Sequence, residues 1–129
     1  MVRRVNLLLD THVLLWWLAD DPKLGAATRA AIADGRNDVH VSSVTIAEIA
    51  IKRSQGKLDA PRELLHILIE EGFSELPLLS THAAALETLP WHHRDPFDRM
   101  LVAQAVVEGL TLATADRNLH AYDITVLAD

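Results

Sequence analysis

Two aspartates each follow directly on a mostly apolar segment. Asp10 comes after residues 5–9, and Asp116 comes after residues 112–115. If both segments are strands of a parallel sheet, the two carboxylates emerge at the edge where such sheets bind ligands. Either aspartate alone could also be a turn residue or a helix cap. Their shared placement makes both candidates for a functional site.

Glu48 lies inside an expected helix over residues 44–54. Lys52 follows four residues later, so one interpretation is an exposed helical ion pair. Val44 and Ile51 share the face of Glu48, however, so that face is not simply solvated. The sequence leaves open whether Glu48 is a surface residue or part of a site.

Asp95 and Asp98 flank the start of an expected helix over residues 97–108. Capping and the helix dipole favour acids in a first turn, so structure alone can explain them. A helix start can also direct carboxylates toward the same sheet edge as Asp10 and Asp116. Acids gathered in one pocket repel each other and require a cation, and Mg²⁺ and Mn²⁺ prefer such oxygen ligands. Either ion could activate a water and stabilise charge on a phosphoryl oxygen.

Apolar segments of strand and helix character alternate along the chain. This alternation predicts an α/β sandwich with a mainly parallel sheet. Pro61 is expected at the first position of a helix, and Ser80 is expected to cap another. The strands are expected at residues 5–9, 39–41, 73–78, 110–113 and 124–127, and the helices at residues 13–19, 26–33, 44–54, 61–71, 81–88 and 97–108.

The 129 residues predict one domain, residues 1–129, and half of them are hydrophobic. The absence of cysteine excludes disulfides and thiolate zinc sites and fits a cytoplasmic location. The apolar runs are too short to cross a membrane, and Asp10 interrupts the N-terminal one, which argues against a signal peptide. The net charge of −6 disfavours a nucleic-acid binder. A local basic rim or a bound metal could offset that charge.

Four stretches together resemble the PIN domain, with the VapC toxins of toxin–antitoxin pairs as the closest branch. They are residues 7–12 (LLLDTH), 42–48 (SSVTIAE), 93–99 (HRDPFDR) and 112–117 (LATADR). The resemblance spans nearly the whole chain, with the motifs in the family's order and spacing. It implies a Rossmann-like three-layer sandwich, Mg²⁺ or Mn²⁺, an RNA substrate, a homodimer and a small antitoxin partner.

The resemblance also assigns roles to individual residues. It implies that the metal-binding and catalytic acids are Asp10, Glu48, Asp98 and Asp116. It further implies that Thr11 and Thr114 are hydroxyl residues lining the site. Asp95 is additional to the family's core pattern, and its role stays open.

Basic residues near these acids in sequence could form a phosphate-binding rim or could be ordinary solvated charge. Those considered are Lys52, Arg94, Arg99 and Arg117. Three histidines, His12, His92 and His93, are also near the acids in sequence. Without HExxH spacing, a surface or supporting role is favoured for them over metal ligation. The three tryptophans are better explained by core packing or an interface than by base stacking.

The leading hypothesis is a metal-dependent endoribonuclease that acts as a toxin. The alternative is a module that captures an antitoxin in a repressor complex, and intact acids favour the enzyme. A receiver-type phospho-acceptor would need a strand-end lysine, which is not evident. The helices at residues 13–19 and 44–54 are candidates for an apolar partner groove.

Overall fold

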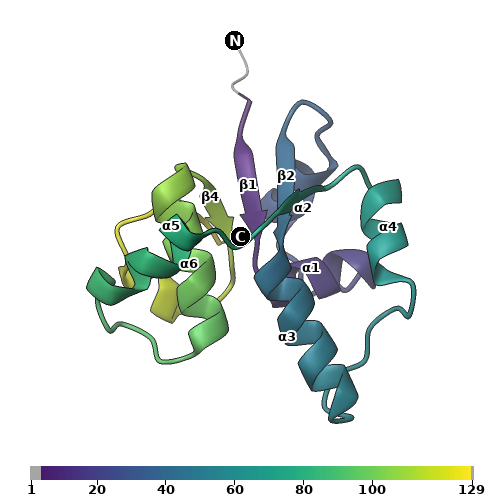
Figure 1. The fold of residues 1–129 in the computed structure, drawn as a ribbon. Helices are drawn as coiled ribbons and strands as arrows, with labels where there is room; N and C mark the ends of the chain where they lie inside the picture. The colour runs from purple at the N-terminus through teal and green to yellow at the C-terminus, as the bar shows by residue number, and fades with distance from the viewer. Residues whose placement is uncertain (1–3, 129) are drawn as a thin grey trace.

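The computed structural model describes residues 4–128, in which five strands form one sheet of order β3-β2-β1-β4-β5 (Figure 1). Every neighbouring pair is parallel, so the expected mainly parallel sheet is confirmed. Because the strands run in one direction, the residues that follow them gather at one edge of the sheet. The strands are β1 (Asn6–Leu9), β2 (Asp38–Ser42), β3 (Ser74–Leu76), β4 (Thr111–Ala113) and β5 (Val126–Leu127).

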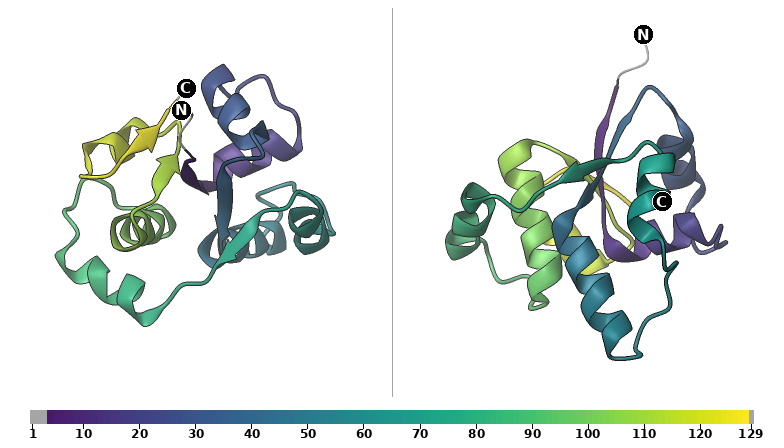
Figure 2. Two further views of the ribbon diagram at one scale, coloured as in Figure 1. Left: turned by 90° about the horizontal axis from the view of Figure 1, so that it is seen from above. Right: turned by 45° about the vertical axis from the view of Figure 1, so that its right-hand side comes forward.

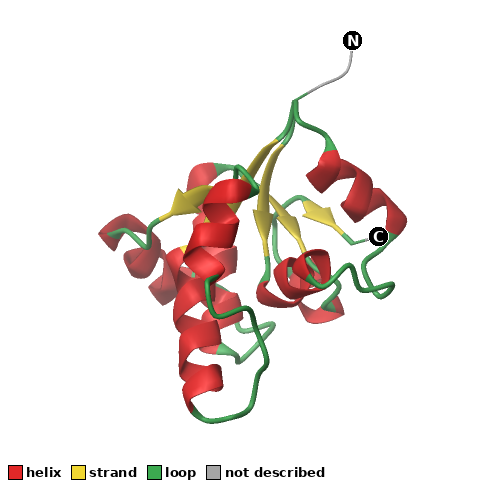
Figure 3. Cartoon of the chain, turned by 90° about the vertical axis from the view of Figure 1, so that its right-hand side faces the viewer, coloured by secondary structure: helices red, strands yellow, loops and turns green. Residues whose placement is uncertain are grey.

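Helices cover both faces of this sheet, which gives the three layers expected from the sequence (Figures 2 and 3). Among residues 4–128, no helix is both long and apolar enough to cross a bilayer. The α-helices are α1 (Thr11–Leu18), α2 (Ala26–Ala33), α3 (Ser43–Ser54), α4 (Leu64–Glu70), α5 (Ser80–Ala85) and α6 (Pro96–Glu108). Two short 3₁₀ helices are η1 (Leu86–Thr88) and η2 (Arg117–Ala121).

The continuous leucine run of β1 fits its central position. Leu7 and Leu9 belong to one buried cluster, while Leu8 points to the opposite face and belongs to a second cluster. Successive side chains of a strand alternate between faces, so a strand covered on both sides must be apolar throughout. Each fully buried leucine contributes about 1.5–3 kcal/mol to stability by leaving water. The position of the residue that follows Leu9 is thereby fixed.

The structure corrects two expected helix starts. α4 begins at Leu64 rather than at Pro61, and the Pro61 carbonyl instead accepts a hydrogen bond from the Arg53 guanidinium. Ser80 lies inside α5 and does not cap it. Leu79 is the N-cap instead, and the Nδ1 atom of His82, in the first turn, accepts its backbone N–H at 3.0 Å.

Candidate active site

Asp10 is the residue that links β1 to α1. Its Oδ1 atom accepts the Val13 N–H at 2.8 Å, so it caps the helix. The side chain is buried, with 4% of the residue exposed. Burial raises the pKa of Asp10, while a hydrogen bond from the Thr114 hydroxyl opposes that rise. A buried carboxylate bound mainly by neutral donors is well placed to receive a cation.

Glu48 lies on the inner face of α3 and is 4% exposed. Its Oε1 atom accepts the Thr11 hydroxyl at 2.6 Å, and Lys52 Nζ lies 2.5 Å from its Oε2. The ion pair with Lys52 therefore exists, but the interpretation of Glu48 as a surface residue is wrong. Its acid is buried because α3 packs against α1, which brings Thr11 beside it.

Asp95 and Asp98 have different local roles at the start of α6. The Oδ1 atom of Asp95 accepts the N–H groups of Phe97 and Asp98 at 2.8 and 3.1 Å, so Asp95 is the N-cap. Asp98 is one turn into the helix and partly buried. Burial, followed by the nearby charge of Asp95, raises the pKa of Asp98 to about 6.

Asp116 follows β4, separated from it by Thr114 and Ala115. The Thr114 hydroxyl accepts the Asp116 N–H at 3.0 Å, and Asp116 Oδ1 accepts the Asn118 N–H at 2.9 Å. These two bonds fix a tight turn and make Asp116 the cap of η2. Its second carboxylate oxygen, Oδ2, faces His93, in the loop before α6.

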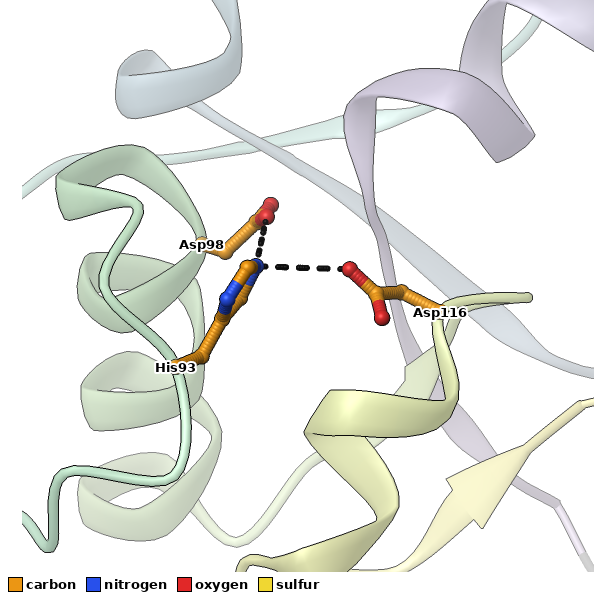
Figure 4. A group of neighbouring side chains, drawn as sticks. All are labelled: His93, Asp98 and Asp116. Atoms are coloured by element: carbon orange, nitrogen blue, oxygen red, sulfur yellow. Dashed lines mark hydrogen bonds and ion pairs between the residues drawn. The ribbon is translucent and has the colours of Figure 1, made fainter.

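His93 lies between Asp98 and Asp116. Its Nε2 atom lies 2.9 Å from Asp98 Oδ2 and 3.3 Å from Asp116 Oδ2 (Figure 4). The imidazole comes from the loop before α6, whereas the two carboxylates come from α6 and from the start of η2. Segments far apart in the sequence thus meet at one point.

The four acids singled out in the sequence converge at the carboxyl edge of the sheet. The charge of Asp10 is among the causes that raise the pKa of Asp98, and the charge of Asp116 is among those that raise the pKa of Asp10. Lys52, bound to Glu48, has its pKa raised by Glu48 and also by Asp98. We call this group the carboxylate pocket: Asp10, Glu48, Asp98 and Asp116.

The basic residues considered for phosphate binding separate into two kinds. Arg94 and Arg117 are exposed, and Lys52 is partly exposed beside Glu48. Arg99 is 4% exposed, so a contact between Arg99 and RNA phosphates does not fit the structure. Its guanidinium is bound within the protein, and a buried arginine has no free donor face to offer.

Arg99 instead anchors the loop that carries His93. It donates hydrogen bonds to the carbonyls of Pro90 and Leu89 at 2.8 and 3.2 Å, and it stacks on the Trp91 ring at 3.7 Å. The Tyr122 hydroxyl accepts the His93 N–H at 3.1 Å from the other side. These contacts support the loop from Leu89 to His93, which contains no regular structure.

The position of His93 against two acids of the carboxylate pocket was not predicted from the sequence. Its proximity to Asp98 in sequence was visible, but the histidines show no HExxH spacing. In the structure the ring of the neighbouring His92 packs edge-on against Tyr122, with 4.9 Å between ring centroids. Only the folded loop selects His93, so no local signal could separate the two.

The donor set of the pocket fits a divalent metal. Three aspartate carboxylates supply hard oxygen ligands, and His93, Asp98 and Asp116 each offer an atom within 4.8 Å of the others. Asp10 is buried and forms no salt bridge within residues 4–128. Mg²⁺ and Mn²⁺ are the ions that such oxygen-rich sites favour.

Comparison with known proteins places this site in a family context. A family model described as PIN domain matches residues 7–124. A curated protein, ribonuclease VapC22 of Mycobacterium tuberculosis, is 29% identical over 120 residues, which span 91% of this chain and 92% of that protein.

Solved structures share the same fold at lower identity. VapBC2 from Rickettsia felis, bound to a DNA fragment from its promoter, matches with a TM-score of 0.70 at 14% identity, over 95% of this chain and 98% of that one. FitAcB from Neisseria gonorrhoeae matches with a TM-score of 0.63 at 23% identity, over 94% of this chain and 96% of that one. DNA-bound VapBC from Salmonella typhimurium matches with a TM-score of 0.68 at 19% identity, over 95% and 97% of the two chains.

Proposed function

The chain belongs to the PIN-domain family, and from this premise we propose that it is a metal-dependent endoribonuclease acting as the toxin of a toxin–antitoxin pair. The observation that carries the proposal is the convergence of Asp10, Glu48, Asp98 and Asp116 on one pocket. Four acids held together in partly buried surroundings cost stability unless a cation joins them. A role in binding a cation explains why the fold collects them.

Each acid has a distinct task in this proposal. Asp10, Asp98 and Asp116 would hold Mg²⁺ or Mn²⁺, while Glu48 would complete the site on the metal or through a water. The bound ion would activate the attacking water and stabilise charge on the phosphoryl oxygen. Thr11 orients Glu48 through its 2.6 Å hydrogen bond, and Thr114 does the same for the turn that carries Asp116.

The basic side chains around the pocket would place the RNA backbone. Lys52 is partly exposed next to Glu48, and Arg94 and Arg117 are exposed on segments next to His93 and Asp116 in sequence. Cations of this kind hold phosphates in register and carry no base specificity. They offset locally the net charge of −6 that argued against a nucleic-acid substrate.

We also propose a small antitoxin partner and a homodimer. Two of the structural neighbours are VapBC proteins bound to DNA. An apolar cavity of about 200 Å³ is lined by residues of β2, α3, α4 and β3. It lies beside the expected helix 44–54, but no residue of the expected helix 13–19 lines it. Leu65 and Ile69 on α4 stay 59% and 75% exposed beside it, as a partner surface requires.

The alternative function is a binding module of a repressor complex with little catalytic activity. The cavity beside α4 is the observation that favours it. The two functions do not exclude each other, because that cavity and the carboxylate pocket share no lining residue. A module without catalysis would have no use for the four acids, so the enzyme is the better supported function.

The decisive experiment is the mapping of RNA ends after brief expression of the wild type and of Glu48→Gln. Wild type is expected to produce new ends at defined sites, and the variant is expected to produce none. The purified protein should cleave RNA in the presence of Mg²⁺ or Mn²⁺, and this cleavage should stop when a chelator is added. New ends that are equally abundant in Glu48→Gln, or cleavage that persists in chelator, would overturn the proposal.

A further inference from the structure

We infer that His93 is a nitrogen ligand of the divalent metal, so that the site prefers Mn²⁺ over Mg²⁺. This inference rests on the proposed function and deepens it, because it concerns which ion the pocket selects. Two observations carry it, the distances from His93 to two carboxylates and the support of its loop, together with the chemistry of imidazole.

The distances match the edges of an octahedral site. An ion with ligands at about 2.0–2.1 Å places neighbouring ligand atoms about 3.0 Å apart. The Nε2 atom of His93 lies 2.9 Å from Asp98 Oδ2 and 3.3 Å from Asp116 Oδ2. All three donor atoms lie within 4.8 Å of one another (Figure 4). With its proton on Nδ1, the ring would direct the Nε2 lone pair into the space between the two carboxylates.

Hydrogen bonds support the backbone that carries this ring. The His93 N–H donates to the Tyr122 hydroxyl at 3.1 Å, and the Arg99 guanidinium also donates to that hydroxyl, at 3.3 Å. Arg99 and Leu119, which packs in the same cluster as Tyr122, are buried. Metal ligands need such orientation by surrounding groups, since a ligand on a loose loop binds weakly.

Imidazole changes which ion the pocket favours. Mg²⁺ takes oxygen ligands almost exclusively and keeps several waters, whereas imidazole suits first-row transition ions. A site with one nitrogen and three carboxylates therefore gains affinity for Mn²⁺ more than for Mg²⁺. The carboxylates alone would discriminate much less between the two ions.

The test measures metal binding on the whole protein without RNA. The probes are MnCl₂ and MgCl₂ alone, with Mn²⁺ followed by its EPR signal and Mg²⁺ by competition. His93→Ala is expected to raise the Mn²⁺ Kd at least about 10-fold and the Mg²⁺ Kd by less. Pulsed EPR of bound Mn²⁺ should show nitrogen coupling that His93→Ala removes. His92→Ala, at the neighbouring ring against Tyr122, is the matched control and should change neither.

The outcomes separate this inference from the proposed function. Asp98→Asn should lose Mn²⁺ binding if the carboxylate pocket is the metal site at all, and its retention would defeat the proposed site itself. If Asp98→Asn loses binding while His93→Ala keeps the Mn²⁺ preference and the nitrogen coupling, only the inference on His93 fails. Tighter binding of both ions by His93→Ala would also overturn it, because the ring would then be competing with the metal.

Discussion

The junction of α5 and α6 and the carboxylate pocket each have a histidine that faces a carboxylate, and the two sites are built in opposite ways. In the junction of α5 and α6, the Nε2 atom of His82 donates to Glu108 at 2.8 Å, and its Nδ1 accepts the Leu79 N–H. In the carboxylate pocket, His93 faces Asp98 and Asp116 together. The first arrangement pairs each group with a complementary one, while the second gathers charges of the same sign.

The junction continues as a chain of satisfied hydrogen bonds. Gln104, fully buried on α6, accepts the Ser42 hydroxyl at 2.6 Å and donates to the Pro77 carbonyl at 3.2 Å. Buried polar groups with complete partners rigidify a fold. In the carboxylate pocket, by contrast, burial and neighbouring negative charges disfavour the ionised carboxylates, and the pKa values of Asp10 and Asp98 are both raised. The junction therefore stabilises the fold, whereas ionisation of Asp10 and Asp98 in the pocket opposes folding.

The largest expected effect is on cleavage, from Asp98→Asn. This nearly isosteric change removes one charge from a site that must hold a divalent cation, at little cost in packing. Losing about 3–4 kcal/mol of transition-state stabilisation slows cleavage roughly 10²–10³-fold. Stability without metal should stay level or rise. Paired thermal melts and RNA cleavage assays, with Mg²⁺ and with chelator, check both parts. Full activity in this variant would show that the charge of Asp98 is not needed for cleavage, and the proposed difference between the pocket and the junction would fail.

A smaller effect, on stability alone, is expected from His82→Ala. The substitution opens a cavity at a fully buried ring and leaves the Leu79 N–H without its acceptor. Together these effects cost about 2–4 kcal/mol of unfolding free energy. Urea denaturation measures that loss, and the cleavage rate per folded molecule should remain within about 2-fold of wild type. His82→Gln, which can keep one acceptor, should lose less. A loss of cleavage with unchanged stability would assign His82 to the site instead.

The pH dependence of metal-free stability sharpens the comparison further. Because the folded pKa of Asp98 is raised from 3.8 to about 6, its ionisation opposes folding. The penalty is absent below about pH 4, grows between pH 4 and 6, and is complete above that range. Allowing for partial exposure, it amounts to about 1–2 kcal/mol.

Urea unfolding of wild type and Asp98→Asn in chelator, at several pH values, measures this penalty. The variant should exceed wild type in stability at pH 7, and the gap should shrink toward pH 4. Glu108→Gln in the junction serves as the control. Glu108 faces His82 rather than other carboxylates, so loss of its charge should not produce a stability gain that grows with pH. A gap for Asp98→Asn that does not vary with pH would contradict the raised pKa.

The parallel sheet and its helices could be predicted from the sequence, because local patterns of apolar residues determine them, and the same patterns mark the acids that follow the strands as candidates. Apolar runs such as β1 end at an acid, and the residue after a strand has its position fixed by the strand. The roles of His93 and Arg99 depend instead on the loop before α6, whose conformation is set by contacts with Tyr122 and Trp91. Such long-range contacts leave no periodic pattern. For the same reason the sequence did not show that Glu48 is buried, because its burial follows from the packing of α3 on α1.

The smallest effect is expected at Asp95, the acid whose role the sequence left open. Asp95 accepts two N–H groups as the cap of α6, and its charge is one cause of the raised pKa of Asp98. Asparagine caps a helix about as well as aspartate, so Asp95→Asn should keep stability and stay within a few-fold of wild-type cleavage. Asp95→Ala removes the cap and should cost about 1 kcal/mol of unfolding free energy. A cleavage loss for Asp95→Asn as large as that for Asp98→Asn would show that Asp95 binds the metal, because only its charge would have changed.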